Sequence, residues 1–403
     1  MKQGTPHRKG PLQCLAIAGL SLGLMHAPAA EAAQAAADTC RAAAAWPLWE
    51  QFAARHMQRD GRVVDYSSPQ QHSTSEGQSY SMLFALIARD RERFHKLWNW
   101  SIANLSGGKP GEHMPAWQWG RKEDGTWGVI DPNSASDANL WFAYALLEAA
   151  RVWNEPRYDA QARTLLAQVA MQEVVDIPGL GPTLLPALKG FVLKEKSTWR
   201  LNPSYLPVPL ARALEQADPG GPWTAVLASQ MRMISETTPM GFAADWVAYD
   251  IPQGATKGAF VSDPVKGDIG SYDAIRTYLW AGMTPRTDKL YSTLKARLDG
   301  MENALRTSLV PPEKVQTTLG APEGIGPVGF SAALLPYLKA RYAKASLKTQ
   351  QDRVTSQLLN SKAGAQPPYY DQVLGLFGTG WIEQRYQFLP NGRLQLRWEK
   401  ACP

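Results

Sequence analysis

The sequence predicts an all-α protein in which paired helices form a ring. Amphipathic segments follow one another along most of the 403 residues, and Gly- and Pro-rich connectors separate them. Ser-acid motifs also recur at three of the expected helix starts. A ring of paired helices is an economical way to bury the apolar faces of about ten to twelve helices in one domain.

The individual helices are predicted from apolar residues at helical spacing. In the segment QSYSMLFALIARD, for example, Tyr80, Leu83 and Ile87 fall on one face. Helices are expected at 46–58, 78–90, 90–105, 137–153, 158–172, 205–216, 222–237, 273–283, 288–307, 328–342, 345–360 and 368–380. Short alternating stretches near 389–398 predict a small hairpin.

The N-terminus has the pattern of a secretory signal peptide. Lys2, Arg8 and Lys9 precede an apolar run from Leu12 to Leu24, and small residues then offer cleavage sites near 29–33. We therefore divide the chain into a signal peptide, 1–32, and a single domain, 33–403, of an exported protein with a formal charge of +4 instead of +6. No later stretch reaches the roughly 18 apolar residues of a membrane span.

Two cysteines remain after the signal peptide and lie close to the two ends of the chain. Thiols in an oxidising compartment tend to pair, so a Cys40–Cys402 bridge is expected, and two free thiols on the tails are the alternative. In a closed ring the first and last helices are neighbours, which is the geometry that the bridge requires.

Three acids follow serines at helix starts and share a local pattern. They are Glu76 in STSEGQS, Asp137 in SASDANL and Asp273 in GSYDAIR, separated by 61 and 136 residues. With six helical hairpins of roughly 62 residues each, the acids would occupy equivalent positions on inner helices and converge at one end of the ring. The alternative is helix capping, because Ser73 with Glu76 and Ser134 with Asp137 have the spacing of capping boxes.

Converging carboxyls favour glycoside hydrolysis, which needs one protonated and one ionised carboxyl beside the scissile bond. A helix N-terminus stabilises the ionised form, so a general acid there requires burial and a neighbouring negative charge. Asp137 is the candidate for the neighbour that keeps Glu76 protonated.

Tryptophans supply flat surfaces that suit the apolar face of a sugar ring. Trp117, Trp119 and Trp127 lie in a Gly- and charge-rich loop, where substrate stacking is favoured over core packing. By contrast, Trp98, Trp100, Trp141 and Trp153 lie on periodic helical segments and are expected in the core.

Other kinds of chemistry lack their motifs. The six histidines form no H-E-x-x-H pattern and the cysteines no C-x-x-C pattern, so neither a metal nor another cofactor is expected. There is no phosphate-binding glycine loop and no G-x-S-x-G elbow. The basic residues are spread out, which argues against nucleic acid as a partner.

These segments resemble glycoside hydrolase family eight, and within it the periplasmic endoglucanases encoded with bacterial cellulose synthases. The matching segments, in chain order, are GRVVDYSSPQQHSTSEGQSYSMLFAL, MPAWQWGRKEDGTW, DPNSASDANLWFAYALLEA, EVVDIPGLGPTLLP, NPSYLP, SYDAIRTYLWAGM and GPVGFSAALLPYL. The resemblance implies an (α/α)6 barrel with an open cleft that hydrolyses β-1,4-glucan with inversion.

The resemblance also implies roles for residues. Glu76 would be the general acid, Asp273 the general base, and Asp137 a ligand of the sugar at the cleaved subsite. Tyr205 and Arg276 would position the water and the base, and Trp119 would be a stacking platform.

The expected partner is cellulose-type β-1,4-glucan in the periplasm or outside the cell, and a cellulose synthase export complex is a further candidate. The principal alternative is a non-catalytic glycan-binding protein that guides polysaccharide during export; a polysaccharide lyase is a weaker one. Intact acids at 76 and 273 favour the hydrolase.

Overall fold

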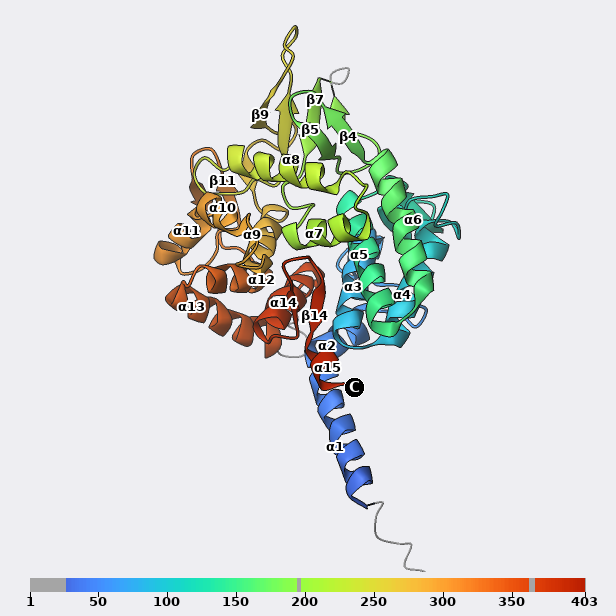
Figure 1. The fold of residues 1–403 in the computed structure, drawn as a ribbon. Coiled ribbons are helices and arrows are strands. Elements are labelled where there is room, and N and C mark those ends of the chain that lie inside the picture. Colours follow the sequence, from blue (N-terminus) through green and yellow to red (C-terminus); the bar gives the residue numbers. More distant parts are fainter. Residues whose placement is uncertain (1–26, 194–196, 362–366, 403) are drawn as a thin grey trace, which may run out of the picture.

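The computed structural model describes residues 27–193, 197–361 and 367–402. The apolar run from Leu12 to Leu24 lies outside these ranges, so the predicted division at residue 32 stays a prediction. The structure begins with α1 (Ala27–Ala44), which projects from one side of the molecule (Figure 1). Within the described ranges, no helix has both the length and the apolar character needed to cross a bilayer.

Six inner helices pack side by side into a closed ring. In order around the ring they are α3 (Ser75–Ile87), α5 (Ser136–Trp153), α7 (Val208–Ala217), α9 (Ala274–Met283), α12 (Val328–Ala340) and α14 (Tyr369–Ile382), and α14 returns to α3. Two of the inner helices are buried on nearly every side: all of α9 is buried, and so is every residue of α3 except Glu76.

The outer layer consists of helices that each precede an inner one. These are α2 (Pro47–His56), α4 (Arg91–Leu105), α6 (Pro156–Gln172), α8 (Trp223–Glu236), the pair α10 (Tyr291–Arg297) and α11 (Gly300–Ser308), and α13 (Lys344–Val354), which ends in a π-helical turn at Thr355–Leu359. This double ring is the expected (α/α)6 barrel, and the all-α fold class is confirmed.

Aromatic side chains from four inner helices fill the centre of the ring. The ring centroids of Trp141 and Trp280 lie 5.2 Å apart, and Phe377 lies 5.1 Å from Trp280 and 5.2 Å from Tyr80. Close packing of two helices also depends on Gly378, because a Cβ there would come within 1.9 Å of the Ala332 carbonyl oxygen. The centre of the barrel is therefore filled with side chains, and Tyr80 lies where this core meets the cavity.

The two ends of the barrel have different connectors. Inner helices leave through tight turns, in which Arg89, Asn154, Tyr342 and Gln384 adopt positive φ angles. Inner helices are entered through long connectors at 57–74, 106–135, 173–207, 237–273 and 309–327. The cleft therefore forms at the entry end, where long connectors surround the helix N-termini.

Short strands in the long connectors form small antiparallel sheets that the periodicity did not predict. They are β1 (Ser73–Thr74), β2 (Gln118–Arg121) and β3 (Trp127–Asp131); β4 (Val174–Ile177) and β5 (Gly181–Leu184); β6 (Val192–Leu193), β7 (Thr198–Leu201), β8 (Val247–Asp250) and β9 (Ala259–Ser262); and β10 (Ile269–Gly270), β11 (Lys314–Gln316) and β12 (Ala321–Glu323). Strands of two to five residues are too short for alternation to show.

Two sequence predictions need correction. The single helix at 288–307 is wrong: a break at Leu298 and Asp299 divides it into α10, which ends at Arg297, and α11, which begins at Gly300. The hairpin near 389–398 exists but is displaced, because β13 (Tyr386–Phe388) and β14 (Leu394–Leu396) flank the turn and α15 (Arg397–Ala401) follows at once.

The two chain ends meet at the base of the barrel. Helices α1 and α15 pack together, and a disulfide joins Cys40 to Cys402, whose Cα atoms are 4.7 Å apart. The Arg89 guanidinium donates to the Cys40 sulfur at 2.6 Å. The bridge closes the chain over a sequence separation of 362 residues.

Candidate active site

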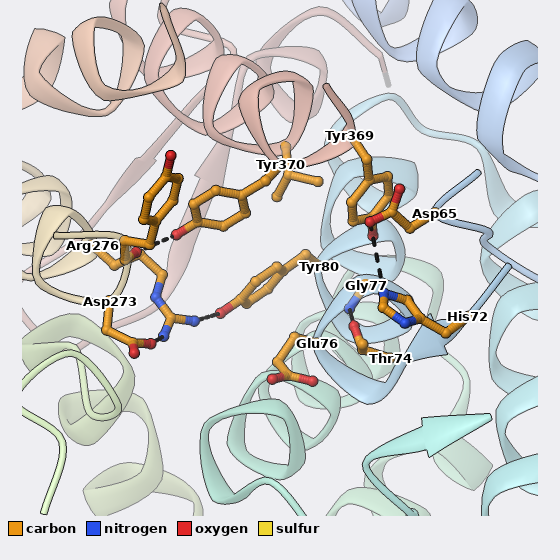
Figure 2. A pocket seen from close by; sticks show the side chains of 12 residues that line it. Asp65, His72, Thr74, Glu76, Gly77, Tyr80, Asp273, Arg276, Tyr369 and Tyr370 are labelled. Atoms are coloured by element: carbon orange, nitrogen blue, oxygen red, sulfur yellow. Dashed lines mark hydrogen bonds and ion pairs between the residues drawn. The ribbon is translucent and has the colours of Figure 1, made fainter. Parts of the chain in front are cut away.

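A cavity of about 370 Å³ opens at the entry end of the ring. Figure 2 shows side chains from α3, α14, the start of α9 and the connector before α3, with Glu76 and Asp273 on the same cavity and Tyr80 between them. The lining residues are Asp65, His72, Thr74, Glu76, Gly77, Tyr80, Tyr272, Asp273, Arg276, Tyr369, Tyr370 and Val373. Two acids that are 197 positions apart in the chain thus share one cleft.

Glu76 lies in the first turn of α3, but it is not part of a capping box. Thr74 is the N-cap residue, and its side chain accepts from the Gly77 amide at 3.1 Å. Ser73 instead accepts a hydrogen bond from the Arg62 Nε. The capping alternative is also wrong at α5, where Ala135 is the N-cap and the Ser134 hydroxyl donates to Glu173.

The Glu76 carboxyl receives only neutral donors. The Trp117 indole N–H donates to Oε1 at 3.1 Å and the Ser75 hydroxyl to Oε2 at 3.2 Å. The Glu76 carboxyl is only partly exposed, and this loss of contact with water, followed by the charge of Asp137, raises its pKa to about 8. The charge of Asp137 thus acts on Glu76 in the direction that the sequence predicts, and a pKa of about 8 favours the protonated carboxyl at neutral pH.

Asp137 is buried near the start of α5 and receives three hydrogen bonds. Oδ1 accepts from the Ala138 amide at 2.8 Å, and Oδ2 accepts from the Tyr80 hydroxyl at 3.3 Å and the Arg276 guanidinium at 3.1 Å. Burial raises the pKa of Asp137 and the cation of Arg276 opposes that shift. Because Arg276 contacts Asp137 directly, we assign the negative charge of the Glu76–Asp137 pair to Asp137.

Asp273 is the N-cap residue of α9 and remains partly open to solvent. Arg276, one turn later, donates to Oδ1 at 2.5 Å, and the Trp246 indole N–H donates to Oδ2 at 3.0 Å. Asp273 thus has the cation that Glu76 lacks.

Arg276 connects both aspartates beneath the cleft. Its side chain is 8% exposed, and it forms ion pairs with Asp137 and Asp273 as well as a hydrogen bond to the Tyr80 oxygen at 3.1 Å. Among the described residues, no partner contacts its buried Nε. The role that the resemblance implied for Arg276, holding the base, is consistent with this position.

Tyr205 lies against the same group without lining the cavity itself. Its ring contacts Trp246 edge-on at 5.9 Å, and the Arg276 guanidinium carbon lies 5.6 Å from the ring centre. Burial, together with Asp137 and the other nearby acids, raises the pKa of Tyr205 well above its usual value. Its hydroxyl is therefore neutral, which suits a donor to water.

The three loop tryptophans lie on the Glu76 side of the cleft. Trp119 and Trp127 stack at 5.6 Å, and the buried Arg62 guanidinium lies 4.4 Å from one ring centre and 4.8 Å from the other. Trp127 is 48% exposed, whereas Trp117 is occupied by its bond to Glu76. Arg62 therefore holds an aromatic pair at the edge of the site, with Trp127 more open than Trp119.

Sequence reasoning did not identify several residues of the cleft wall. Tyr369 and Tyr370 begin α14, and Asp65 and His72 precede α3 with their side chains 3.7 Å apart. Burial alone would raise the pKa of Asp65. Hydrogen bonds from His72 and Ser67 stabilise the charged form more strongly and lower the pKa to about 2. The one available signal was the Tyr-Tyr-Asp sequence at another expected helix start.

No cluster of three His, Cys, Asp or Glu side chains suited to a metal occurs within the described part of the chain.

Comparison with known proteins places these observations in a family. The model of glycosyl hydrolases family 8 matches residues 25–384. An endoglucanase from Xanthomonas axonopodis is 48% identical over 358 residues, which cover 89% of this chain and 91% of the relative. An endoglucanase from Pseudomonas fluorescens is 45% identical over 404 residues, which cover 97% of this chain and 98% of the relative. The crystal structure of an endo-1,4-D-glucanase from Vibrio fischeri is similar with a TM-score of 0.79 and 35% identity, covering 88% of this chain and 100% of that one.

Proposed function

The chain belongs to glycosyl hydrolase family 8 and is a glycoside hydrolase of the endoglucanase type, and from this premise we propose that it cleaves cellulose-type β-1,4-glucan with inversion. The observation that carries the proposal is the unequal environment of two carboxyls on one cavity. Glu76 keeps its proton because its pKa is raised to about 8, whereas Asp273 is paired with Arg276.

Glu76 acts as the general acid. Its proton passes to the glycosidic oxygen as the bond from that oxygen to the anomeric carbon breaks, so the leaving chain departs as a neutral alcohol. The neutral donors Trp117 and Ser75 orient the carboxyl without drawing its proton away.

Asp273 acts as the general base. It takes a proton from a water molecule, whose oxygen bonds to the anomeric carbon on the face opposite the leaving group, and the configuration inverts. Arg276 and Trp246 each hold one carboxylate oxygen of Asp273. To the neutral hydroxyl of Tyr205, whose ring lies against Trp246 and Arg276, we assign the role of orienting the water. An inverting enzyme needs about 6.5–9.5 Å between its two carboxyls to admit this water.

Asp137 and the tryptophans hold the glucan. Asp137 binds the sugar at the cleaved subsite and keeps Glu76 protonated, while Trp117, Trp119 and Trp127 offer ring faces along the Glu76 side of the cleft. Aromatic contact area of this kind suits the alternating apolar faces of a β-1,4-glucan.

We place this activity in cellulose biosynthesis, in the periplasm or outside the cell, with a cellulose synthase export complex as a candidate partner. The N-terminal sequence pattern and the Cys40–Cys402 disulfide support an oxidising compartment. In the same proposal, residues 1–32 are removed and 33–403 form the catalytic domain.

The test uses mature protein with carboxymethylcellulose and cello-oligosaccharides. New reducing ends are assayed, and NMR reads the anomer of fresh product before it equilibrates. We expect wild type to release α-configured ends and Glu76→Gln to release almost none. A β-configured product would contradict inversion, and an undiminished Glu76→Gln variant would contradict the role of Glu76.

A further inference from the structure

Two consecutive residues, Asp245 and Trp246, contact Asp273 from the loop before β8. A single oxygen of Asp245, Oδ1, accepts the backbone N–H groups of Ser271, Asp273 and Ala274 at 2.7, 3.0 and 2.7 Å. The next residue, Trp246, donates its indole N–H to the Asp273 carboxylate at 3.0 Å. The backbone and the side chain of Asp273 are thus held by neighbouring residues 27 and 28 positions earlier in the chain.

The loop that carries this pair is itself fixed on both sides. The Asp245 amide donates to the Ile269 carbonyl at 2.8 Å, and the Ala243 amide donates to the Tyr278 hydroxyl on α9 at 2.9 Å. Gly270 admits the loop, because a Cβ at that position would lie 2.1 Å from the Ala243 carbonyl oxygen. The position of the loop is therefore set by α9 and by the segment leading into it.

Trp246 is fixed by a stack of its own. Its ring lies parallel to Phe191 at 5.4 Å and 11°, and the Arg200 guanidinium carbon lies 5.2 Å from its centre. Arg200 in turn forms a buried ion pair with Asp263 at 2.7 Å. The indole N–H therefore points at Asp273 from a ring with little freedom to rotate.

We propose that Asp245 and Trp246 form a clamp that positions Asp273 for proton abstraction from water. The inference rests on the proposed role of Asp273 as general base. Asp245 fixes where α9 begins, and hence where the Cα of Asp273 lies; Trp246 and Arg276 then each occupy one carboxylate oxygen. The remaining lone pairs face the cavity, where the water must sit.

Glu76 is held differently. The Trp117 carbonyl accepts the Ser75 amide at 2.9 Å and the Trp117 indole donates to the Glu76 carboxyl, but within the described ranges no carboxylate gathers the backbone amides at the start of α3 as Asp245 does at α9. The helix start at Glu76 is capped by Thr74, which lies two residues away and accepts the Gly77 amide alone. The difference suits the two roles, because a base must hold a small water molecule in line for attack, and a misplacement of about 1 Å can cost roughly 100-fold in rate. An acid contacts an oxygen that the bound polymer itself holds in place.

The test compares Asp245→Ala and Asp245→Asn with wild type on cello-oligosaccharides. We expect Asp245→Ala to lower kcat by about 10- to 100-fold with KM within about twofold, because the water and not the glucan loses its alignment. Asp245→Asn keeps an oxygen that can accept the three amides and should retain kcat within about threefold. Trp246→Phe removes one hydrogen bond to the carboxylate and should lower kcat by about tenfold.

A matched control is Asp90→Ala. Asp90 caps outer helix α4 by accepting the Arg93 amide at 3.0 Å, at the opposite end of the barrel. This variant should lose thermal stability as Asp245→Ala does, yet keep kcat, which separates positioning from general destabilisation.

Sodium azide provides a readout that a purely structural role would not move. Azide attacks as an anion and needs no proton removed, so it should accelerate Asp245→Ala and Asp273→Ala, but neither wild type nor Glu76→Gln, and yield an α-glycosyl azide. Acceleration of Asp273→Ala without acceleration of Asp245→Ala would overturn the clamp. If azide accelerates neither Asp245→Ala nor Asp273→Ala, the kinetic constants decide. An equal loss of kcat in Asp245→Ala and Asp245→Asn, or an unchanged kcat in Asp245→Ala, would overturn the clamp.

The two proposals fail differently. Full activity in Asp273→Ala would refute the general-base assignment itself. An inactive Asp273→Ala beside a fully active Asp245→Ala would refute only the clamp.

Discussion

The surroundings of Glu76 and Asp273 differ although both acids stand at the N-terminal ends of inner helices. The same helix dipole acts on both and favours the ionised carboxylate. Glu76 has two neutral donors and the negative charge of Asp137 nearby, and its pKa rises to about 8. Asp273 has the cation of Arg276 at 2.5 Å and the indole of Trp246 at 3.0 Å.

The immediate neighbours of a carboxyl therefore affect its pKa more than the helix terminus does. A dipole contributes about 0.3–1 kcal/mol, whereas each pKa unit corresponds to about 1.4 kcal/mol. A carboxyl that is withdrawn from water and lies beside a second, ionised carboxylate can therefore stay protonated, although the helix dipole alone would favour its ionised form.

The largest expected effect comes from removing either acid in turn. Glu76→Gln and Asp273→Asn should each lower kcat/KM on glucan by about 10²- to 10⁴-fold. With a 2,4-dinitrophenyl cello-oligosaccharide, whose leaving group needs no proton, only Glu76→Gln should regain most of its activity. Equal recovery of both variants in a steady-state assay would contradict the assigned difference.

Arg276→Met should come next, because it leaves Asp137 buried without its cation. Breaking a buried ion pair in this way costs about 3–5 kcal/mol, so thermal denaturation should shift clearly and activity should fall with it. Arg306→Met is the matched control: its pair with Glu302 involves a side chain that is 65% exposed, and little change is expected. Similar shifts in both variants would argue against Arg276 as the shared partner of the two aspartates.

Asp137→Asn should alter how activity depends on pH. The general acid works only while protonated, so activity is present below the pKa of Glu76 and is lost as the pH rises through about 8. Removing the charge of Asp137 lets Glu76 ionise more easily, and the alkaline limb of kcat/KM should move to lower pH. An unmoved limb would show that burial alone keeps Glu76 protonated.

The smallest effect on the site is expected from Cys40→Ser combined with Cys402→Ser. The bridge lies at the base of the barrel and constrains the unfolded chain, so its loss should destabilise the protein by about 2–5 kcal/mol. Differential scanning calorimetry should show a lower melting temperature, while the pH profile of kcat/KM at 25 °C stays the same. A shifted pH profile would show that the disulfide at the base of the barrel affects the active site at the other end, contrary to this prediction.

The sequence alone predicts most of the helices, because apolar residues recur at helical spacing. It also predicts the convergence of the acids, because the intervals between them match the length of a helical hairpin. Glu76, Asp137 and Asp273 lie on the first, second and fourth inner helices, as intervals of 61 and 136 residues predict. Core positions for four tryptophans also followed from helical periodicity. The structure buries Trp98, Trp100 and Trp141, whereas Trp153 is only partly buried against the core.

The rest of the site depends on connectors that carry no periodic signal. Asp245 lies in a long connector, and it is held near the start of α9 by the hydrogen bond from its amide to the Ile269 carbonyl of β10. The predicted capping boxes at Ser73 and Ser134 are wrong for a related reason. The strand and the turn before the helices place the first helical residues one position later, so that Thr74 and Ala135 are the N-cap residues. Local spacing predicts helices, whereas the pairing of short strands decides which polar groups meet above them.

The assignment of acid and base depends on the protonation state of Glu76, which can be measured. Mature protein labelled with ¹³C at the glutamate side-chain carboxyl is titrated by NMR, and the Glu76 resonance is identified by its absence in Glu76→Gln. The account predicts that this resonance titrates near pH 8, and at lower pH in Asp137→Asn. A Glu76 carboxyl that loses its proton near its usual value of 4.5 would contradict the account.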